Sequence, residues 1–228
     1  LQQKRERDGK VIVGATVHRH FDRLLQIWPD ARFIHLVRDP RDVARSSIQM
    51  GWAGNTYVAL DRWLHAEGLW DSLETELPRD RWINLQFEKL IGDAQQELTR
   101  ICDFIGVLFD PAMFDYANAS TYDLPDPASV QQWRSKSSNR DVRLAEARVG
   151  SWLESRGYEL SGLPPMQISA LQRVWLQSQS KWATRINRCR TLGLPLALAD
   201  VFSRRLPGQP FRRTVHARVY EVARLHWK

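Results

Sequence analysis

The sequence predicts an α/β domain organised around a parallel β-sheet. Two short apolar runs, 10-KVIVGATV-17 and 32-RFIHLV-37, are typical of buried parallel strands, and a helical stretch separates them. A third run of this kind, 82-WINLQF-87, follows a long helical segment. Strands that alternate with helices usually form right-handed β-α-β units with parallel strands. The 228 residues are enough to bury a substantial core.

Helix signals occupy the intervals between these strands. Four apolar residues at helical spacing give the first interval one apolar face: Phe21, Leu24, Leu25 and Trp28. Asp39 is a suitable N-cap and Pro40 suits the first helical position, so we expect a helix from Pro40 to about Met50. Further helices are expected at residues 56–77, 94–105 and 141–156. The stretch 118–139 is rich in Ser, Asn, Asp and Pro, and we expect a long surface loop there.

Charge is distributed unevenly along the chain. Residues 165–228 carry 12 Lys and Arg against 2 Asp and Glu, a net +10, whereas residues 1–164 have a net charge of −3. We therefore expect a core at 1–164 and a basic helical extension at 165–228, broken near Pro195 and Pro207. Such an extension could bind an acidic substrate, a nucleotide, nucleic acid or a membrane surface. The alternative is that its basic residues only form a solvated helical face.

The two cysteines, Cys102 and Cys189, lie far apart and lack the spacing of metal ligands. We expect neither a disulfide framework nor a metal site, and the cysteine usage favours a cytoplasmic location. No apolar run approaches the roughly 20 residues that a membrane-spanning helix needs.

Arg38 is the strongest candidate binding residue. It ends a predicted strand directly before a helix, and open parallel sheets bind ligands at this place. A helix N-terminus favours phosphate, and a guanidinium contacts two phosphate oxygens at once. Ser46 offers a hydroxyl two turns into the helix, while Arg41 and Arg45 add positive charge. The alternative is a well-capped helix start with a surface ion pair.

The run 33-FIHLVRDPRDVARS-46 closely resembles the 3′-phosphate-binding segment of the sulfotransferases that use 3′-phosphoadenosine 5′-phosphosulfate (PAPS). In that family a strand ends in Arg, Asp-Pro or Asn-Pro opens a helix, and Ser follows eight residues after the Arg. The resemblance extends to 25-LQIWPDAR-32, to 83–115 and to 152-WLESRGYEL-160. It implies a three-layer α/β/α fold of the P-loop nucleotide-binding type, with Arg38 and Ser46 holding the 3′-phosphate.

Two features depart from the family pattern. Many members have Tyr near the adenine where this chain has Phe87, which can stack on a base but cannot donate a hydrogen bond; a core aromatic at a strand end is the alternative. The family's Gly-rich loop, which surrounds the 5′-phosphosulfate, has no counterpart here, since neither Gly9 nor Gly14 begins such a run. We therefore expect an N-terminally incomplete fold that binds nucleotide with little or no transfer.

The resemblance also implies a base that removes the acceptor's proton. Some members use a His after a strand, which makes His18 the first choice and His20 the second. His35, inside a predicted strand, is expected in the core.

The implied activity is sulfonate transfer from PAPS, without a metal, to a hydroxyl or amine on a small-molecule, lipid or carbohydrate acceptor. No nucleic-acid partner is expected, and peripheral membrane contact through the basic extension is an additional expectation. The alternative is a non-catalytic relative that binds a nucleotide or a polyanion.

Overall fold

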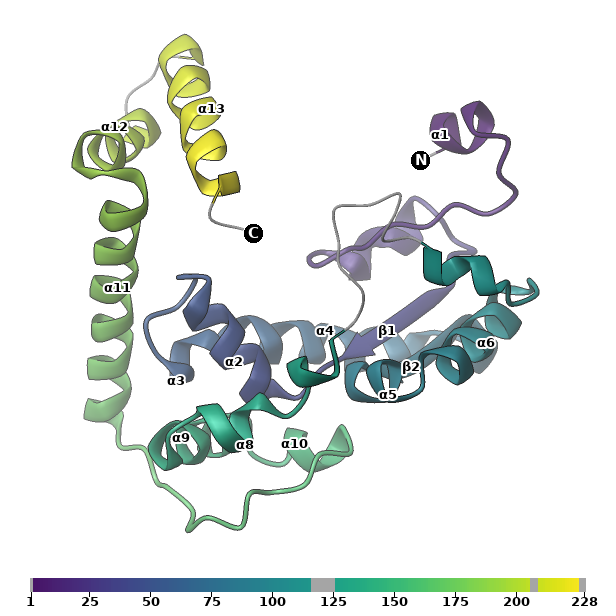
Figure 1. Ribbon diagram of the computed structural model, residues 1–228, viewed down its shortest axis with the longest axis horizontal. Coiled ribbons are helices and arrows are strands. Elements are labelled where there is room, and N and C mark those ends of the chain that lie inside the picture. Colours follow the sequence, from purple (N-terminus) through teal and green to yellow (C-terminus); the bar gives the residue numbers. More distant parts are fainter. Residues whose placement is uncertain (1, 116–125, 206–208, 226–228) are drawn as a thin grey trace.

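A computed structural model describes residues 2–115, 126–205 and 209–225. Its centre is a parallel pair of strands, β1 (Phe33–Val37) and β2 (Trp82–Gln86), shown in Figure 1. Phe33 lies opposite Trp82 and Val37 opposite Gln86, so the two strands end at the same edge of the sheet. The strands expected at 32–37 and 82–87 are thereby confirmed.

Helices make up most of the rest of the described chain. The N-terminal part contains α1 (Gln2–Arg7) and η1 (Phe21–Gln26). Between the strands lie α2 (Pro40–Gln49), α3 (Thr56–Ala59), α4 (Asp61–Glu76) and η2 (Arg79–Arg81). After β2 follow α5 (Phe87–Gly92), α6 (Ala94–Ile105), η3 (Pro111–Asp115), η4 (Pro127–Ser129), α8 (Gln132–Lys136), α9 (Asn139–Val149) and α10 (Trp152–Ser155). The basic extension folds into α11 (Ala170–Leu192), α12 (Leu194–Arg205) and α13 (Gln209–Leu225).

The helices with strong end signals are confirmed. The Asp39 carboxylate accepts a hydrogen bond from the Arg41 backbone N–H at 2.9 Å and so caps α2. Asp93 caps α6 in the same way through the Gln96 N–H at 3.0 Å. Each cap satisfies a donor that the first helical turn leaves free. The helix expected at 56–77 is present as α3 and α4, which meet at Leu60.

The strand expected at 10–17 is wrong. This segment is irregular and exposed, and the Val11 side chain is 90% exposed. A strand becomes stable when its backbone pairs with a neighbour. In the described chain the only ladder joins β1 to β2, so β-branched composition alone does not make this segment a strand.

The helix expected around residues 21–28 is a short 3₁₀ helix, η1. Phe21, Leu24 and Leu25 do pack toward the core, against the cluster that contains Phe33 and Trp70. Trp28 does not, because the helix ends before it and leaves its side chain exposed.

Two further expectations need correction near the end of the core. The predicted loop 118–139 contains α8, where Trp133 is buried, and its first part, residues 118–125, lies outside the described part of the chain. The single helix expected at 141–156 is divided into α9 and α10, because Gly150 has φ 58° and ψ −136°, a conformation that interrupts a helix.

The sheet is packed mainly against α4. Phe33 and Val37 point into two buried clusters, one with Trp70, Leu73 and Leu77 and one around Leu60 and Trp63. On the opposite face of β1, Ile34 and Leu36 remain exposed. A small parallel sheet in a mostly helical protein is therefore what the structure describes, and the complete three-layer arrangement stays a prediction.

The first helix of the basic extension is attached to the core. The Gly54 N–H donates to Ser180 Oγ at 2.9 Å, and Asn55 Nδ2 donates to the Leu176 carbonyl at 2.7 Å. A Cβ at Gly54 would lie 2.8 Å from the Ser180 Cα, so this close approach requires glycine. In Figure 1, α11 runs along one side of the molecule, with α2 and α3 on one flank. The boundary at residue 164 stays a prediction, although the α11 helix of the extension is hydrogen-bonded to the core.

Both cysteines are free thiols; Cys102 is buried and Cys189 half-buried. No helix in the described residues is long and apolar enough to span a membrane.

Candidate nucleotide-binding site

The candidate site lies at the edge where both strands end. Because Val37 lies opposite Gln86, the next residues, Arg38 and Phe87, leave the sheet side by side. The Arg38 guanidinium carbon lies 4.6 Å from the centre of the Phe87 ring, a cation–π contact. The sequence placed both residues in one site, and the structure brings them into contact.

Arg38 is held by two hydrogen bonds. Its carbonyl accepts from Trp63 Nε1 at 3.1 Å, and its Nη2 donates to the Ser129 carbonyl at 2.8 Å. Its Nε is buried and has no acceptor among the described residues. A buried donor without an acceptor is costly, and an anion that reached this guanidinium would satisfy it. The chemistry of Arg38 therefore fits a phosphate group.

The carboxylate of Glu88, in the first turn of α5, fixes the turn between β1 and α2. Glu88 accepts a hydrogen bond from the Asp39 N–H at 2.9 Å and another from the Tyr158 hydroxyl at 2.8 Å. Burial, followed by the negative charge of Glu88, raises the pKa of Tyr158 well above its ordinary value. Tyr158 thus remains a neutral hydrogen-bond donor, and the turn that carries Arg38 is anchored to the start of α5 and to the segment that follows α10.

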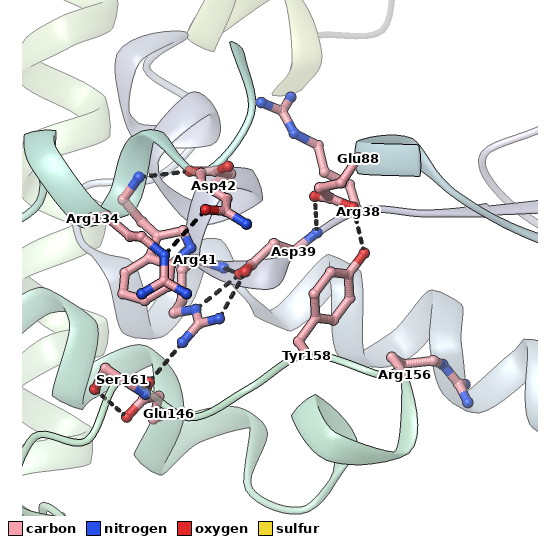
Figure 2. A network of polar contacts seen from close by, with 12 residues as sticks. Arg38, Asp39, Arg41, Asp42, Glu88, Arg134, Glu146, Arg156, Tyr158 and Ser161 are labelled. Carbon is pink, nitrogen blue, oxygen red and sulfur yellow. Dashed lines mark hydrogen bonds and ion pairs between the residues drawn. The ribbon is translucent and has the colours of Figure 1, made fainter. Parts of the chain in front are cut away.

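Arg41 lies inside the protein, and Figure 2 shows its guanidinium between Asp39 and Glu146. It donates to the Asp39 carboxylate through Nε at 3.0 Å and Nη2 at 2.8 Å, and to Glu146 through Nη1 at 2.8 Å. Its guanidinium carbon lies 3.6 Å from the centre of the Trp133 ring. In the same view the Arg38 side chain points away from this network. A nucleotide contact of Arg41 stays a prediction, and in this structure its partners are carboxylates.

Asp42 occupies the first turn of α2 and is fully buried. One carboxylate oxygen accepts the Trp133 N–H at 2.8 Å, while the other has no partner among the described residues. Burial raises the pKa of this carboxyl, and the charge of Asp39 adds to the effect; the Trp133 N–H and the charge of Arg38 oppose it. Asp42 therefore fixes α8 against α2.

Arg45 and Ser46 lie further along α2, and both are half-buried. Arg45 Nη1 donates to the Lys136 carbonyl at 2.7 Å. The Ser46 hydroxyl has no hydrogen-bond partner in the described residues, so it is available to a ligand. A cavity of about 160 Å³ is lined by Arg41 and Arg45 but not by Arg38, Ser46 or Phe87. This volume is below the several hundred Å³ of a typical ligand site.

The two candidate bases lie on the irregular N-terminal segment. His18 and His20 are exposed, and His20 has a positive φ of 54° directly before η1. Their catalytic role stays a prediction. No group of three or more metal-ligating side chains occurs in the described part of the chain.

A second polar network lies between the sheet and α4, and the sequence did not predict it. His35 stacks on Trp70 with ring centres 4.4 Å apart, and its Nε2 contacts the buried Glu67 carboxylate at 3.3 Å. Glu67 also forms an ion pair with Arg156, which reaches Asp71 at 2.6 Å. The expected core position of His35 is confirmed; its polar partners come from distant segments, so no local pattern indicated them.

We expect this network to make stability depend on pH. Burial alone would raise the pKa of Glu67, but hydrogen bonds and charge interactions with His35 and Arg156 lower it below its ordinary 4.5. A lowered folded-state pKa stabilises the protein above about pH 4.5, and this contribution is lost as the pH falls through the folded value. Glu67→Gln should lower the free energy of unfolding by about 2 kcal/mol at pH 7 and by clearly less near pH 3. The loss stays moderate because Asp71 still pairs with Arg156.

Urea unfolding of both proteins across this pH range tests the expectation. A matched control is Glu76→Gln at the exposed C-terminal end of α4, which should change the unfolding free energy little at any pH. A Glu67→Gln penalty that stays constant from neutral to acid pH would contradict the assignment.

The residues that anchor Arg38 were only partly visible in the sequence. Glu88 directly follows Phe87, and Tyr158 belongs to the Gly-Tyr segment, so both were within reach of the family resemblance. Ser129, Trp63 and Trp133 carried no local signal, because their roles arise from contacts between segments far apart in the chain.

An arginine at the carboxyl end of a parallel strand, beside a capped helix N-terminus, is an arrangement of α/β proteins that bind phosphate-bearing ligands. Residues 11–111 match the model of the sulfotransferase family. The resemblance inferred from the sequence is thereby confirmed.

Two solved structures are similar to the chain. One is the sulfotransferase domain of the olefin synthase of Synechococcus PCC 7002, at 27% identity and a TM-score of 0.47, covering 59% of this chain and 50% of that one. The other is a sulfotransferase domain from the curacin biosynthetic pathway, at 20% identity and a TM-score of 0.44, covering 57% and 55%. The chain thus spans about half the length of these domains. A search of curated proteins gave no significant match.

Proposed function

We propose that this chain provides the adenosine 3′-phosphate half of the donor site of a PAPS-dependent sulfotransferase. One observation carries the proposal: the Arg38 guanidinium lies over Phe87 at the edge where β1 and β2 end, and its buried Nε lacks an acceptor in the described residues. Arg38 would bind the 3′-phosphate, Ser46 would add a hydroxyl donor, and Phe87 would pack on the adenine.

The reaction of such an enzyme is an in-line sulfonate transfer. A hydroxyl or amine of the acceptor forms a bond to sulfur, while the bond from sulfur to the 5′-phosphate oxygen of PAPS breaks. The acceptor loses its proton to a base, proposed here as His18 with His20 as second choice, and adenosine 3′,5′-bisphosphate leaves. A small-molecule, lipid or carbohydrate acceptor and a cytoplasmic location stay predictions.

Arg41 and Arg45 would contribute in a different way from Arg38. Arg41 is engaged by Asp39 and Glu146, so it would support the site through the turn and not by direct contact. Arg45 is half-buried and would add positive charge along α2.

The first test is nucleotide discrimination by the purified chain. We expect adenosine 3′,5′-bisphosphate to bind at least about tenfold more tightly than adenosine 5′-monophosphate, since a charge-assisted arginine–phosphate contact contributes about 1.5–3 kcal/mol. Isothermal titration calorimetry measures both affinities. Adenosine 2′,5′-bisphosphate, which has the same charge, is the matched control ligand. Equal affinity for all three nucleotides would contradict a 3′-phosphate site.

A transfer assay can exclude the alternative, a non-catalytic relative that binds a nucleotide or a polyanion, only if transfer is observed. Arg38 and Ser46 would address the far end of PAPS, whereas transfer requires donors aimed at the sulfonate and the departing phosphate. We therefore expect nucleotide binding with little sulfonate transfer by these 228 residues alone. Fast transfer would contradict this expectation and exclude the non-catalytic alternative.

A further inference from the structure

Helix α11 displays an apolar stripe along the side that faces away from the core. Leu171, Trp175, Trp182 and Ile186 recur at helical spacing on this side, and their side chains are 84%, 53%, 63% and 50% exposed. Single exposed apolar residues are ordinary on protein surfaces, but a row that includes two tryptophans indicates an interaction surface.

The opposite side of α11 is occupied by the core. Leu176 and Ser180 are buried there, Leu176 packs with Tyr57 and Leu144, and Ser180 accepts the Gly54 N–H. The helix is thus already fixed in place by one side. The stripe on its other side is therefore not needed to hold α11 on the protein.

The charge of α11 identifies the kind of surface that the stripe fits. The helix contains five basic residues and no acidic one: Arg173, Lys181, Arg185, Arg188 and Arg190. Arg173 lines a cavity on the core side with Tyr57, and Arg188 pairs with Asp200 of α12, so Lys181 and Arg185 carry the charge beside the stripe. Lys181 directly precedes Trp182, and Arg185 follows one helical turn later with its guanidinium carbon 5.4 Å from the centre of the Trp182 ring. An apolar row with tryptophans and basic residues beside it is typical of helices that lie in the interface of a bilayer, where indole rings and cations meet lipid headgroups.

We propose that α11 is a membrane-surface helix that docks this protein on anionic lipid through the stripe of Leu171, Trp175, Trp182 and Ile186. A second copy of the chain is a poor occupant, because two facing α11 helices would bring the Lys181 and Arg185 charges of both copies together, and α11 has no acidic residue to offset them. The helix lies on the membrane and does not cross it, in keeping with its lack of a long apolar run. This docking surface is independent of the proposed nucleotide site.

Flotation with lipid vesicles tests the proposal on the full 228-residue chain. We expect partitioning into vesicles of phosphatidylcholine with about one third phosphatidylglycerol to exceed partitioning into pure phosphatidylcholine at least tenfold, since each basic residue near an anionic surface contributes about 1 kcal/mol, about fivefold. This excess should shrink in about 0.5 M salt. Equal partitioning into both vesicles, or none into either, would overturn the proposal.

Two variants separate the apolar and electrostatic contributions. The double variant Trp175→Ser/Trp182→Ser should reduce binding to anionic vesicles at least about tenfold. The double variant Lys181→Gln/Arg185→Gln should reduce binding to anionic vesicles by a similar factor and leave residual binding to neutral vesicles unchanged. The matched control is Trp28→Ser, which replaces a tryptophan that is 42% exposed at the end of η1. All three variants should keep the wild-type melting temperature and nucleotide affinity. A concentration-dependent dimer in light scattering, abolished by the α11 tryptophan substitutions, would assign the stripe to a second copy instead.

Discussion

Replacing Arg41 with Met should destabilise the protein by about 3 kcal/mol. Removing one partner of a buried ion pair typically costs about 3–5 kcal/mol, because the remaining charge stays buried. The lower end applies here, since Glu146 still accepts hydrogen bonds from the Ser161 N–H at 2.8 Å and hydroxyl at 2.9 Å. The Arg41 backbone N–H would also continue to donate to Asp39. Urea unfolding followed by tryptophan fluorescence measures the loss.

Two further variants show whether the ion pair causes the effect. Arg45→Met, one turn further along α2, removes a half-buried guanidinium whose strongest bond goes to a single carbonyl, and should cost about 1 kcal/mol or less. Arg41→Met/Glu146→Gln removes both charges and should cost at least about 1 kcal/mol less than the two single changes together. Strict additivity would mean that Arg41 stabilises through Asp39 or through packing on Trp133, and not through its pair with Glu146.

The helix starts were predicted correctly because their signals are local. Asp39-Pro40 and Asp93 mark helix starts by capping chemistry, which operates within a few residues. The runs before Arg38 and Phe87 form strands because each finds the other as a parallel partner. The run at 10–17 has similar composition but no partner strand in the described chain, and composition cannot show whether a partner exists.

The sequence indicated the positions of the candidate site residues in the fold, but not their contacts. The sequence placed Arg38 and Phe87 at the ends of parallel strands, and the register brings them together. It placed Arg41 beside Arg38 with the same expected ligand, although one guanidinium lies at the sheet edge and the other between two carboxylates. Glu146 lies 105 residues after Arg41. Only the folded structure reveals that partner.

Replacing Arg38 with Ala should weaken binding of adenosine 3′,5′-bisphosphate by at least about tenfold and leave the affinity for adenosine 5′-monophosphate nearly unchanged. The loss corresponds to a charge-assisted contact of about 1.5–3 kcal/mol to the group by which the two nucleotides differ. Arg38→Lys should lie between wild type and Ala, because an ammonium keeps the charge but not the planar fork. Calorimetric titration of each variant with both nucleotides gives the comparison.

The structure also provides a control for charge and one for folding. Arg62→Ala removes an exposed guanidinium on α4 that lies 5.9 Å from the Trp52 ring, and it should leave both affinities unchanged. Arg38→Ala loses its hydrogen bond to the Ser129 carbonyl and its contact with Phe87, so the melting temperature must be measured with each titration. If a folded Arg38→Ala protein loses both nucleotides equally, Arg38 supports the site as a whole and does not recognise the 3′-phosphate. If it loses only the bisphosphate, the edge where β1 and β2 end is the 3′-phosphate site.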